Sequence, residues 1–241
     1  MKIDIQDELN RPDPVNWLFC GDSITQGAAH TRGGRDYPQH FRERLGELAR
    51  NEDIVINTAV GGWSTGTLEP RLEDRVLRHQ PDVVFLLFGT NDAVGGAEGL
   101  DAFTERYKGI VNRIREAGIR KVILQTTVPM IRVDPEAQTA AMNWPDPQMR
   151  AAKLHGLKQR LQHIESYVEA TRNAAAAAGV PLVDHWAVWE ECGGQRGQIT
   201  DGGFHPNEYG HILMAHTLIR ACGMWDEKSW VCRLFVPVNH P

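Results

Sequence analysis

The feature that most constrains the fold is a run of six apolar residues at 83–88, which Pro81-Asp82 precedes and Gly89 follows. A strand of a parallel sheet is covered on both faces and reads as a continuous apolar run, whereas a strand with one face in water alternates apolar and polar residues. A short apolar run between proline and glycine favours a strand over a helix. The segment therefore predicts a buried strand of a parallel sheet.

Further strands and helices alternate along the chain. Strands are predicted at 15–20, 54–60, 122–128 and 180–184. Helices are predicted at 37–50, 68–79, 101–118, 147–178 and 208–220, the fourth starting from Asp146-Pro147 as cap and first turn. This order predicts an α/β fold of three layers, in which a five-stranded parallel sheet is doubly wound in the flavodoxin-like manner.

A chain of 241 residues fits one domain of this kind. We expect a polar N-terminal extension at 1–14, the α/β domain at 15–222 and a tail at 223–241. The tail carries Trp230, Leu234, Phe235 and Val236, enough apolar residues to pack on the domain or on a partner subunit. A homo-oligomer is therefore left open.

Charge and composition exclude several classes of partner. The net charge is −5, and the 26 lysines and arginines are scattered rather than clustered, so neither nucleic acid nor a membrane surface is expected as a partner. Residues 1–14 lack the apolar core of a signal peptide, which predicts a cytoplasmic protein. The four cysteines have no metal-ligand spacing and are expected as free thiols.

Small and polar residues follow the first three strands. Gly21-Asp22-Ser23 follows the first, Gly61-Gly62 the second, and Gly89-Thr90-Asn91 the third. The carboxyl ends of the strands are where doubly wound sheets bind ligands. A tight turn at Gly21 would expose the Ser23 hydroxyl there, but serine needs a base and oxyanion donors to act as a nucleophile.

Four blocks in this order resemble the SGNH hydrolases, also called the GDSL esterase/lipase family. They are Gly-Asp-Ser-Ile-Thr at 21–25, the glycine of the second turn, Gly-Thr-Asn-Asp at 89–92, and Asp201 with His205-Pro206-Asn207. The resemblance covers the chain from residue 15 to about residue 220, and it implies the SGNH hydrolase fold and serine ester hydrolysis without a metal or an organic cofactor.

Carried over to this chain, the resemblance implies that Ser23 is the nucleophile and His205 the general base. The oxyanion hole then consists of the backbone N–H groups of Ser23 and Gly62 and the side-chain amide of Asn91. Gly62 is preferred to Gly61 because it lies five residues after Asn57, which is the family's spacing.

The acidic member of the triad departs from the family pattern. The family has its acid three residues before the histidine, but residue 202 is glycine and Asp201 lies four residues before His205. Either a bulge at Gly202-Gly203 still brings Asp201 to the imidazole, or a backbone carbonyl orients His205 and the pair works as a dyad. We favour the bulge, because glycines are the residues that such a kink uses.

The substrate is expected to be a small-molecule or glycan ester. Trp63 beside Gly62 and Trp144 within 130–145 are candidates for the pocket walls. No long apolar lid is evident, which favours short acyl groups, with O-acetyl groups on carbohydrate among the candidates. The alternatives are a lysophospholipase or thioesterase acting on lipid acyl groups, and an inactive binding protein on the same fold.

Overall fold

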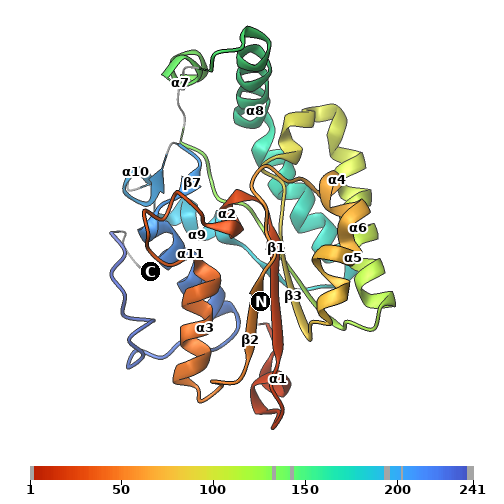
Figure 1. Cartoon of the computed structure of the whole chain (residues 1–241), viewed down its shortest axis with the longest axis vertical. Helices are drawn as coiled ribbons and strands as arrows, with labels where there is room; N and C mark the ends of the chain where they lie inside the picture. Colours follow the sequence, from red (N-terminus) through yellow and green to blue (C-terminus); the bar gives the residue numbers. More distant parts are fainter. Residues whose placement is uncertain (1–2, 132–133, 142–143, 193–195, 202, 238–241) are drawn as a thin grey trace.

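The computed structural model describes residues 3–131, 134–141, 144–192, 196–201 and 203–237. Its centre is a five-stranded sheet with the order β2-β1-β3-β4-β5, in which every neighbouring pair is parallel (Figure 1). The strands are β1 (Asn16–Gly21), β2 (Ile54–Asn57), β3 (Val83–Leu87), β4 (Lys121–Gln125) and β5 (Leu182–Val183). This confirms the predicted doubly wound fold, since the order is that of flavodoxin-like sheets.

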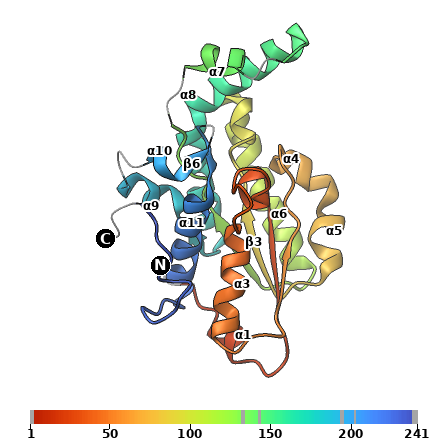
Figure 2. The ribbon, with the colours of Figure 1, turned by 60° about the vertical axis from the view of Figure 1, so that its left-hand side comes forward.

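Helices cover both faces of the sheet, so the molecule has three layers (Figures 1 and 2). One face is covered by α1 (Gln6–Asn10), α3 (Tyr37–Glu47), α9 (His185–Glu191) and α11 (Glu208–Ala221). The other face is covered by α4 (Thr65–Leu68), α5 (Leu72–Arg75), α6 (Leu100–Glu116) and the second half of α8 (Pro147–Ala178). Short elements complete the described chain: α2 (Ser23–Gln26), α7 (Pro135–Ala141), α10 (Arg196–Ile199), β6 (Thr200–Asp201), β7 (His205–Pro206), and the 3-10 helices η1 (Glu69–Arg71), η2 (Leu77–His79), η3 (Asp92–Gly95) and η4 (Ala97–Gly99).

The position of β3 between the two helical layers explains why its sequence is apolar throughout. Val83, Phe85 and Leu87 pack into the core on the α3 and α11 side, whereas Val84 and Leu86 pack into the core on the α6 and α8 side. Successive side chains of a strand point to opposite faces, so a strand between two helical layers buries both sets. All five residues are fully buried.

The chain turns sharply where β1 ends. A Cβ atom on Gly21 would lie 2.7 Å from the Leu87 carbonyl oxygen and 2.5 Å from Thr25 Oγ1, so only glycine permits this close approach. Asp22 then caps α2 by accepting a 2.9 Å hydrogen bond from the Ile24 N–H. Ser23 is thereby placed in the first turn of a short helix at the sheet edge.

The prediction of one continuous helix at 68–79 is wrong. The structure has four short pieces there, α4, η1, α5 and η2. Pro70 is the third residue of the predicted helix, but the observed helical stretch begins at Thr65, so Pro70 lies in its second turn, in η1. Proline has no N–H to donate and its ring clashes with the preceding turn, so an apolar periodicity that suits a helix cannot form one continuously.

Helix α8 starts as predicted, with Asp146 as the cap and Pro147 in its first turn, and it extends over 32 residues. Its first half projects beyond the sheet and carries α7 on it, in Figures 1 and 2. Leu154, Leu157, Leu161, Ile164 and Val168 recur at intervals of three and four residues, a spacing that predicts a core stripe. Only the last two join the core of the sheet, because the first half of the helix has no sheet beneath it.

Both ends of the described chain pack against the α3 and α11 layer. Ile3 and Ile5 are buried there, and the Ile3 N–H donates to the Ala221 carbonyl over 2.7 Å. Val231 and Val236 of the tail are buried in the same cluster. Within the described residues, no helix is long and apolar enough to cross a membrane.

Candidate active site

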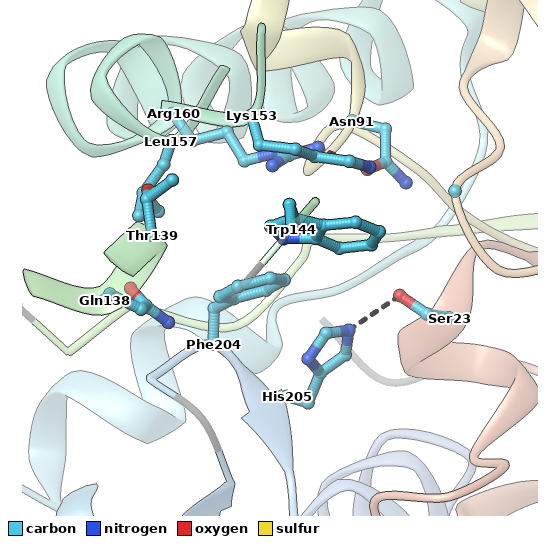
Figure 3. Close-up of a pocket in the computed structure, with 11 residues that line it drawn as sticks. Ser23, Asn91, Gln138, Thr139, Trp144, Lys153, Leu157, Arg160, Phe204 and His205 are labelled. Carbon is cyan, nitrogen blue, oxygen red and sulfur yellow. Dashed lines mark hydrogen bonds between the residues drawn. The ribbon is translucent and has the colours of Figure 1, made fainter. Parts of the chain in front are cut away.

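The turns that follow β1, β2 and β3 meet at the carboxyl edge of the sheet, beneath α7 and the first half of α8. A cavity of about 290 Å³ lies between them (Figure 3). It is lined by Ser23, Gly62, Asn91, Gln138, Thr139, Trp144, Lys153, Leu157, Arg160, Phe204 and His205. Residues from five separate parts of the chain therefore share one site.

Ser23 and His205 face each other at the floor of this cavity (Figure 3). The Oγ of Ser23 lies 2.9 Å from Nε2 of His205, a normal hydrogen-bond distance. The imidazole stacks on His30 with 3.6 Å between ring centroids, and Phe204 lies beside it at 4.2 Å. These rings restrict the orientation of His205, so its Nε2 is positioned to take a proton from the serine hydroxyl.

A small antiparallel hairpin carries His205. Strand β6 pairs with β7 so that Asp201 lies directly opposite His205 along the backbone. Gly203, within the turn, has a φ of +91°, which favours glycine. Gly202 and the side chain of Asp201 lie outside the described part of the chain, so the bulge at 202–203 and the contact of the carboxylate with His205 stay predictions.

Two side chains tie the turn after β2 to the turn after β1. Asn57 donates from Nδ2 to the Thr25 carbonyl over 2.8 Å, and Gln26 accepts from the Gly61 N–H over 3.0 Å. Gly62, next along the chain, has a φ of +82° and lines the cavity. The second turn is thus held beside Ser23 with its glycine backbone facing the substrate space.

Hydrogen bonds fix the side-chain amide of Asn91 on both sides. Its Nδ2 donates to the Trp63 carbonyl over 2.9 Å, and its Oδ1 accepts from Nη2 of Arg160 over 2.8 Å. Arg160 also donates from Nε to the Thr90 carbonyl over 3.0 Å. An amide nitrogen has two hydrogens, and only one is used by Trp63. The arrangement can therefore present the second N–H to an oxygen bound near Ser23.

Asp92 joins the third turn to the second. Its carboxylate accepts from the Thr65 N–H over 3.0 Å and from the Gly89 N–H over 3.2 Å. Burial raises its pKa, and the bonds from Thr65 and Gly89 oppose that shift. Asp92 thus holds Asn91 in place from behind without reaching the cavity.

The two predicted wall residues have different positions. Trp144 lines the cavity above His205, as Figure 3 shows. Trp63 does not belong to the cavity lining, and its ring instead lies beneath Arg75 and Arg71, at 4.9 and 5.6 Å. The backbone of Trp63 is what contributes, because its carbonyl holds Asn91.

Helix α7 lies within 130–145, the segment expected to supply part of the wall, but the contribution of α8 was not predicted. Lys153, Leu157 and Arg160 recur at intervals of four and three residues, so they share one helix face. Of the three, only Leu157 was assigned a role from the sequence, as a member of the core stripe of α8. Gln138 and Thr139 of α7 had no distinguishing pattern.

The neighbouring pair Asp184-His185 is structural. Asp184 pairs with Arg172 at 2.9 Å, and His185 lies fully buried with its Nε2 2.9 Å from Gln125 Oε1. Burial lowers the pKa of His185 to about 3, so it stays neutral. Among the described residues, no group of three or more potential ligands could hold a metal ion.

Asp22 next to the serine gives a pH-dependent prediction. Burial raises its pKa from 3.8 to about 7; the Ile24 N–H opposes the shift, and the nearby Asp92 carboxylate adds to it. Between these values the folded chain binds more protons than the unfolded chain, so Asp22 stabilises the fold below pH 4 and loses that contribution as the pH rises to 7. The variant Asp22→Asn keeps an acceptor for Ile24 but cannot titrate. The free energy of unfolding of the variant, relative to wild type, should rise by on the order of 3 kcal/mol from pH 4 to pH 7.

Denaturant unfolding at several pH values measures this difference. Asp74→Asn is the matched control, because Asp74 is exposed in α5. A difference between Asp22→Asn and wild type that does not change with pH would contradict the assignment.

Comparison with known proteins identifies the family. Residues 19–213 match the GDSL-like lipase/acylhydrolase family. The chain belongs to this family. It is a carboxylic-ester hydrolase of the GDSL, or SGNH, type. The block after which the family is named corresponds to Gly21-Asp22-Ser23-Ile24, with isoleucine in place of leucine, at the turn that ends β1.

Individual relatives agree with this assignment. The chain is 31% identical over 199 residues to the uncharacterized lipoprotein YqeF of Bacillus subtilis (strain 168), covering 75% of this chain and 76% of that protein. It is 25% identical over 227 residues to an acetylxylan esterase of Geobacillus stearothermophilus, covering 89% and 94%. A crystal structure of an acetylxylan esterase from that organism superposes with a TM-score of 0.67 at 21% identity, covering 92% of this chain and 97% of the other, which shows the shared fold. The cellular location stays a prediction.

Proposed function

We propose that this GDSL hydrolase cleaves short-chain acyl esters with Ser23 as the nucleophile and His205 as the general base. The observation that carries the proposal is the 2.9 Å contact between Ser23 Oγ and His205 Nε2, inside a cavity that Gly62 and Asn91 also line. His205 takes the serine proton as Oγ attacks the ester carbonyl. It then gives the proton to the leaving alcohol and activates the water that releases the acid from Ser23.

The oxyanion of the tetrahedral intermediate is proposed to bind the backbone N–H groups of Ser23 and Gly62 and the amide of Asn91. The three donors come from the ends of β1, β2 and β3, and the hydrogen bonds of Asn57, Gln26 and Asp92 hold these turns together. Donors fixed in advance stabilise developing charge without reorganising during the reaction.

Asp201 is proposed as the residue that orients His205. The register of the hairpin, which pairs the two residues across the ladder, supports this role. A triad predicts that Asp201→Asn lowers kcat while the protein stays folded. Full activity of that variant would favour the dyad, in which a backbone carbonyl orients the imidazole.

The proposed substrate is an O-acetyl group on a carbohydrate. The faces of Trp144 and Phe204 suit a sugar ring, and the polar side chains of the lining, such as Gln138 and Thr139, can bond to hydroxyl groups but not to a long acyl chain. Relatives named acetylxylan esterases support the acetyl group. A lysophospholipase or thioesterase activity has no comparable support.

Two measurements test the proposal. A fluorophosphonate probe should label the folded enzyme, and peptide mass spectrometry should locate the label on Ser23. 4-Nitrophenyl acetate should be hydrolysed faster than 4-nitrophenyl decanoate. A folded protein that never reacts with the probe would contradict the mechanism, and faster turnover of the decanoate would overturn the acyl-length assignment alone.

A further inference from the structure

The described lining of the cavity carries positive charge and no carboxylate. Lys153 and Arg160 both line it, and none of the other described lining residues is an aspartate or a glutamate. Both cations come from the same face of α8. Figure 3 shows their side chains along the upper wall of the cavity, above Trp144 and on the side where Asn91 lies. The two positive groups therefore face the same space as the ester to be cleaved.

Arg160 donates to two neutral acceptors, the Thr90 carbonyl and Asn91 Oδ1, and its guanidinium lies 5.8 Å from the centre of the Phe204 ring. A guanidinium has five N–H donors, and these two bonds leave three of them without a bonded acceptor in the described structure. Burial lowers the pKa of Arg160, and Asp22, itself shifted toward the neutral form, is the acid that opposes this. A cation that is partly removed from water normally has a carboxylate partner, and no described one lies within 4 Å.

Lys153 lies at the open side of the cavity and, unlike Arg160, is exposed to solvent. Its ammonium lies 5.3 Å from the centre of the Trp144 ring and forms no ion pair with a described residue. Other cations of the same helix do have acids: Lys158 pairs with Glu136, and Arg172 pairs with Asp184. Arg150, which lies outside the cavity lining, also pairs with no described acid and bonds to the Trp144 carbonyl instead. What distinguishes Lys153 and Arg160 is that both line the cavity, where no described acid faces them.

We propose that Lys153 and Arg160 form an anion subsite, and that the physiological substrate is an O-acetylated sugar that carries a carboxylate or a phosphate. This rests on the proposed function, because an acetyl group has no charge and the anion must then belong to the alcohol half of the ester. Guanidinium and ammonium groups bind carboxylate and phosphate oxygens by charge-assisted hydrogen bonds. The ring of the sugar lies against Trp144 and Phe204, and hydrolysis with one water releases acetate and the free sugar acid or sugar phosphate.

The test compares acetyl esters that differ only in charge. The probes are a methyl glucoside, the corresponding methyl glucuronoside and the methyl glucoside 6-phosphate, each acetylated at the same hydroxyl group, with acetate release as the readout. The wild-type kcat/KM should be at least about tenfold higher for an anionic ester than for the neutral one, and about 0.5 M NaCl should reduce this ratio. A preference for the glucuronoside identifies a carboxylate, and a preference for the phosphate identifies a phosphomonoester.

Lys153→Gln tests the subsite more cleanly than an Arg160 variant, because Arg160 also holds Asn91. The ratio of anionic to neutral kcat/KM should fall about threefold or more in this variant. Lys108→Gln, which removes an exposed charge from α6, should leave the ratio unchanged. Cleavage of the neutral ester as fast as the anionic ones would overturn the subsite while leaving the esterase proposal intact. Failure to cleave any of the three esters, with no fluorophosphonate labelling, would overturn the proposed function itself.

Discussion

Ser23→Ala is expected to lower kcat/KM for 4-nitrophenyl acetate by a factor of about ten thousand to a million. The variant lacks the oxygen that His205 activates at 2.9 Å, so no acyl-enzyme can form. The only catalysis left is attack by water on an ester whose carbonyl oxygen is bound by the remaining oxyanion donors. Initial rates at several substrate concentrations measure the loss, and fluorophosphonate labelling should disappear with it.

Ser64→Ala is the matched control for this variant. Ser64 lies in the turn after β2, where its hydroxyl contacts Thr67 and does not line the cavity. It should retain wild-type activity within about twofold, since surface substitutions of this kind change little. Circular dichroism and the melting temperature establish that both variants are folded. Substantial ester hydrolysis by folded Ser23→Ala would mean that another group attacks the ester.

The fold could be predicted because its signals are local. The apolar run at 83–88 indicates that both faces of β3 are buried. Gly21 at the end of β1 is required because a Cβ atom there would lie 2.7 Å from the Leu87 carbonyl oxygen. The helix at 68–79 was predicted wrongly, since periodicity records which residues are apolar but not that Pro70 lacks a hydrogen-bond donor. Tertiary packing then accommodates four short pieces where one helix was expected.

The residues of the candidate site likewise divide into those that local motifs predicted and those that they did not. Ser23, Gly62, Asn91 and His205 lie in short motifs at strand ends or in a hairpin, and the structure brings all four to one cavity. The wall that α8 contributes to the cavity could not be predicted from the sequence, because Leu157 has the spacing of a core residue and lines the cavity only because this half of α8 extends beyond the sheet. Arg160 was missed for a related reason. A charged residue on a helix normally faces water, and nothing local shows that this one bonds to a turn 69 residues earlier.

Arg160 and Asn91 together show how the oxyanion side of the site is organised. The strand-end turns supply the donors, and two side chains fix their direction: Arg160, which comes from α8, and Asp92 of the third turn, which accepts from Thr65. An amide can rotate by half a turn and exchange its oxygen and nitrogen. Arg160 prevents this, because a guanidinium can donate only to the oxygen. The nitrogen of Asn91 is therefore directed to Trp63 and the cavity.

Asn91→Ala is expected to lower kcat for 4-nitrophenyl acetate about 100- to 1000-fold with little change in KM, because the lost N–H acts mainly on the charged transition state. Asn112→Ala, on the exposed face of α6, is the control and should behave as wild type.

Alanine at position 91 also removes the acceptor that Arg160 uses, so a second variant is needed to separate the two roles. Asn91→Asp keeps an oxygen for Arg160 but replaces the N–H donor with a carboxylate oxygen. If Asn91 donates to the oxyanion, the aspartate variant should be at least as inactive as the alanine variant, since it places negative charge beside the developing oxyanion. If Asn91 served only to hold Arg160, aspartate would bind the guanidinium more strongly and preserve activity, and that result would remove Asn91 from the oxyanion hole.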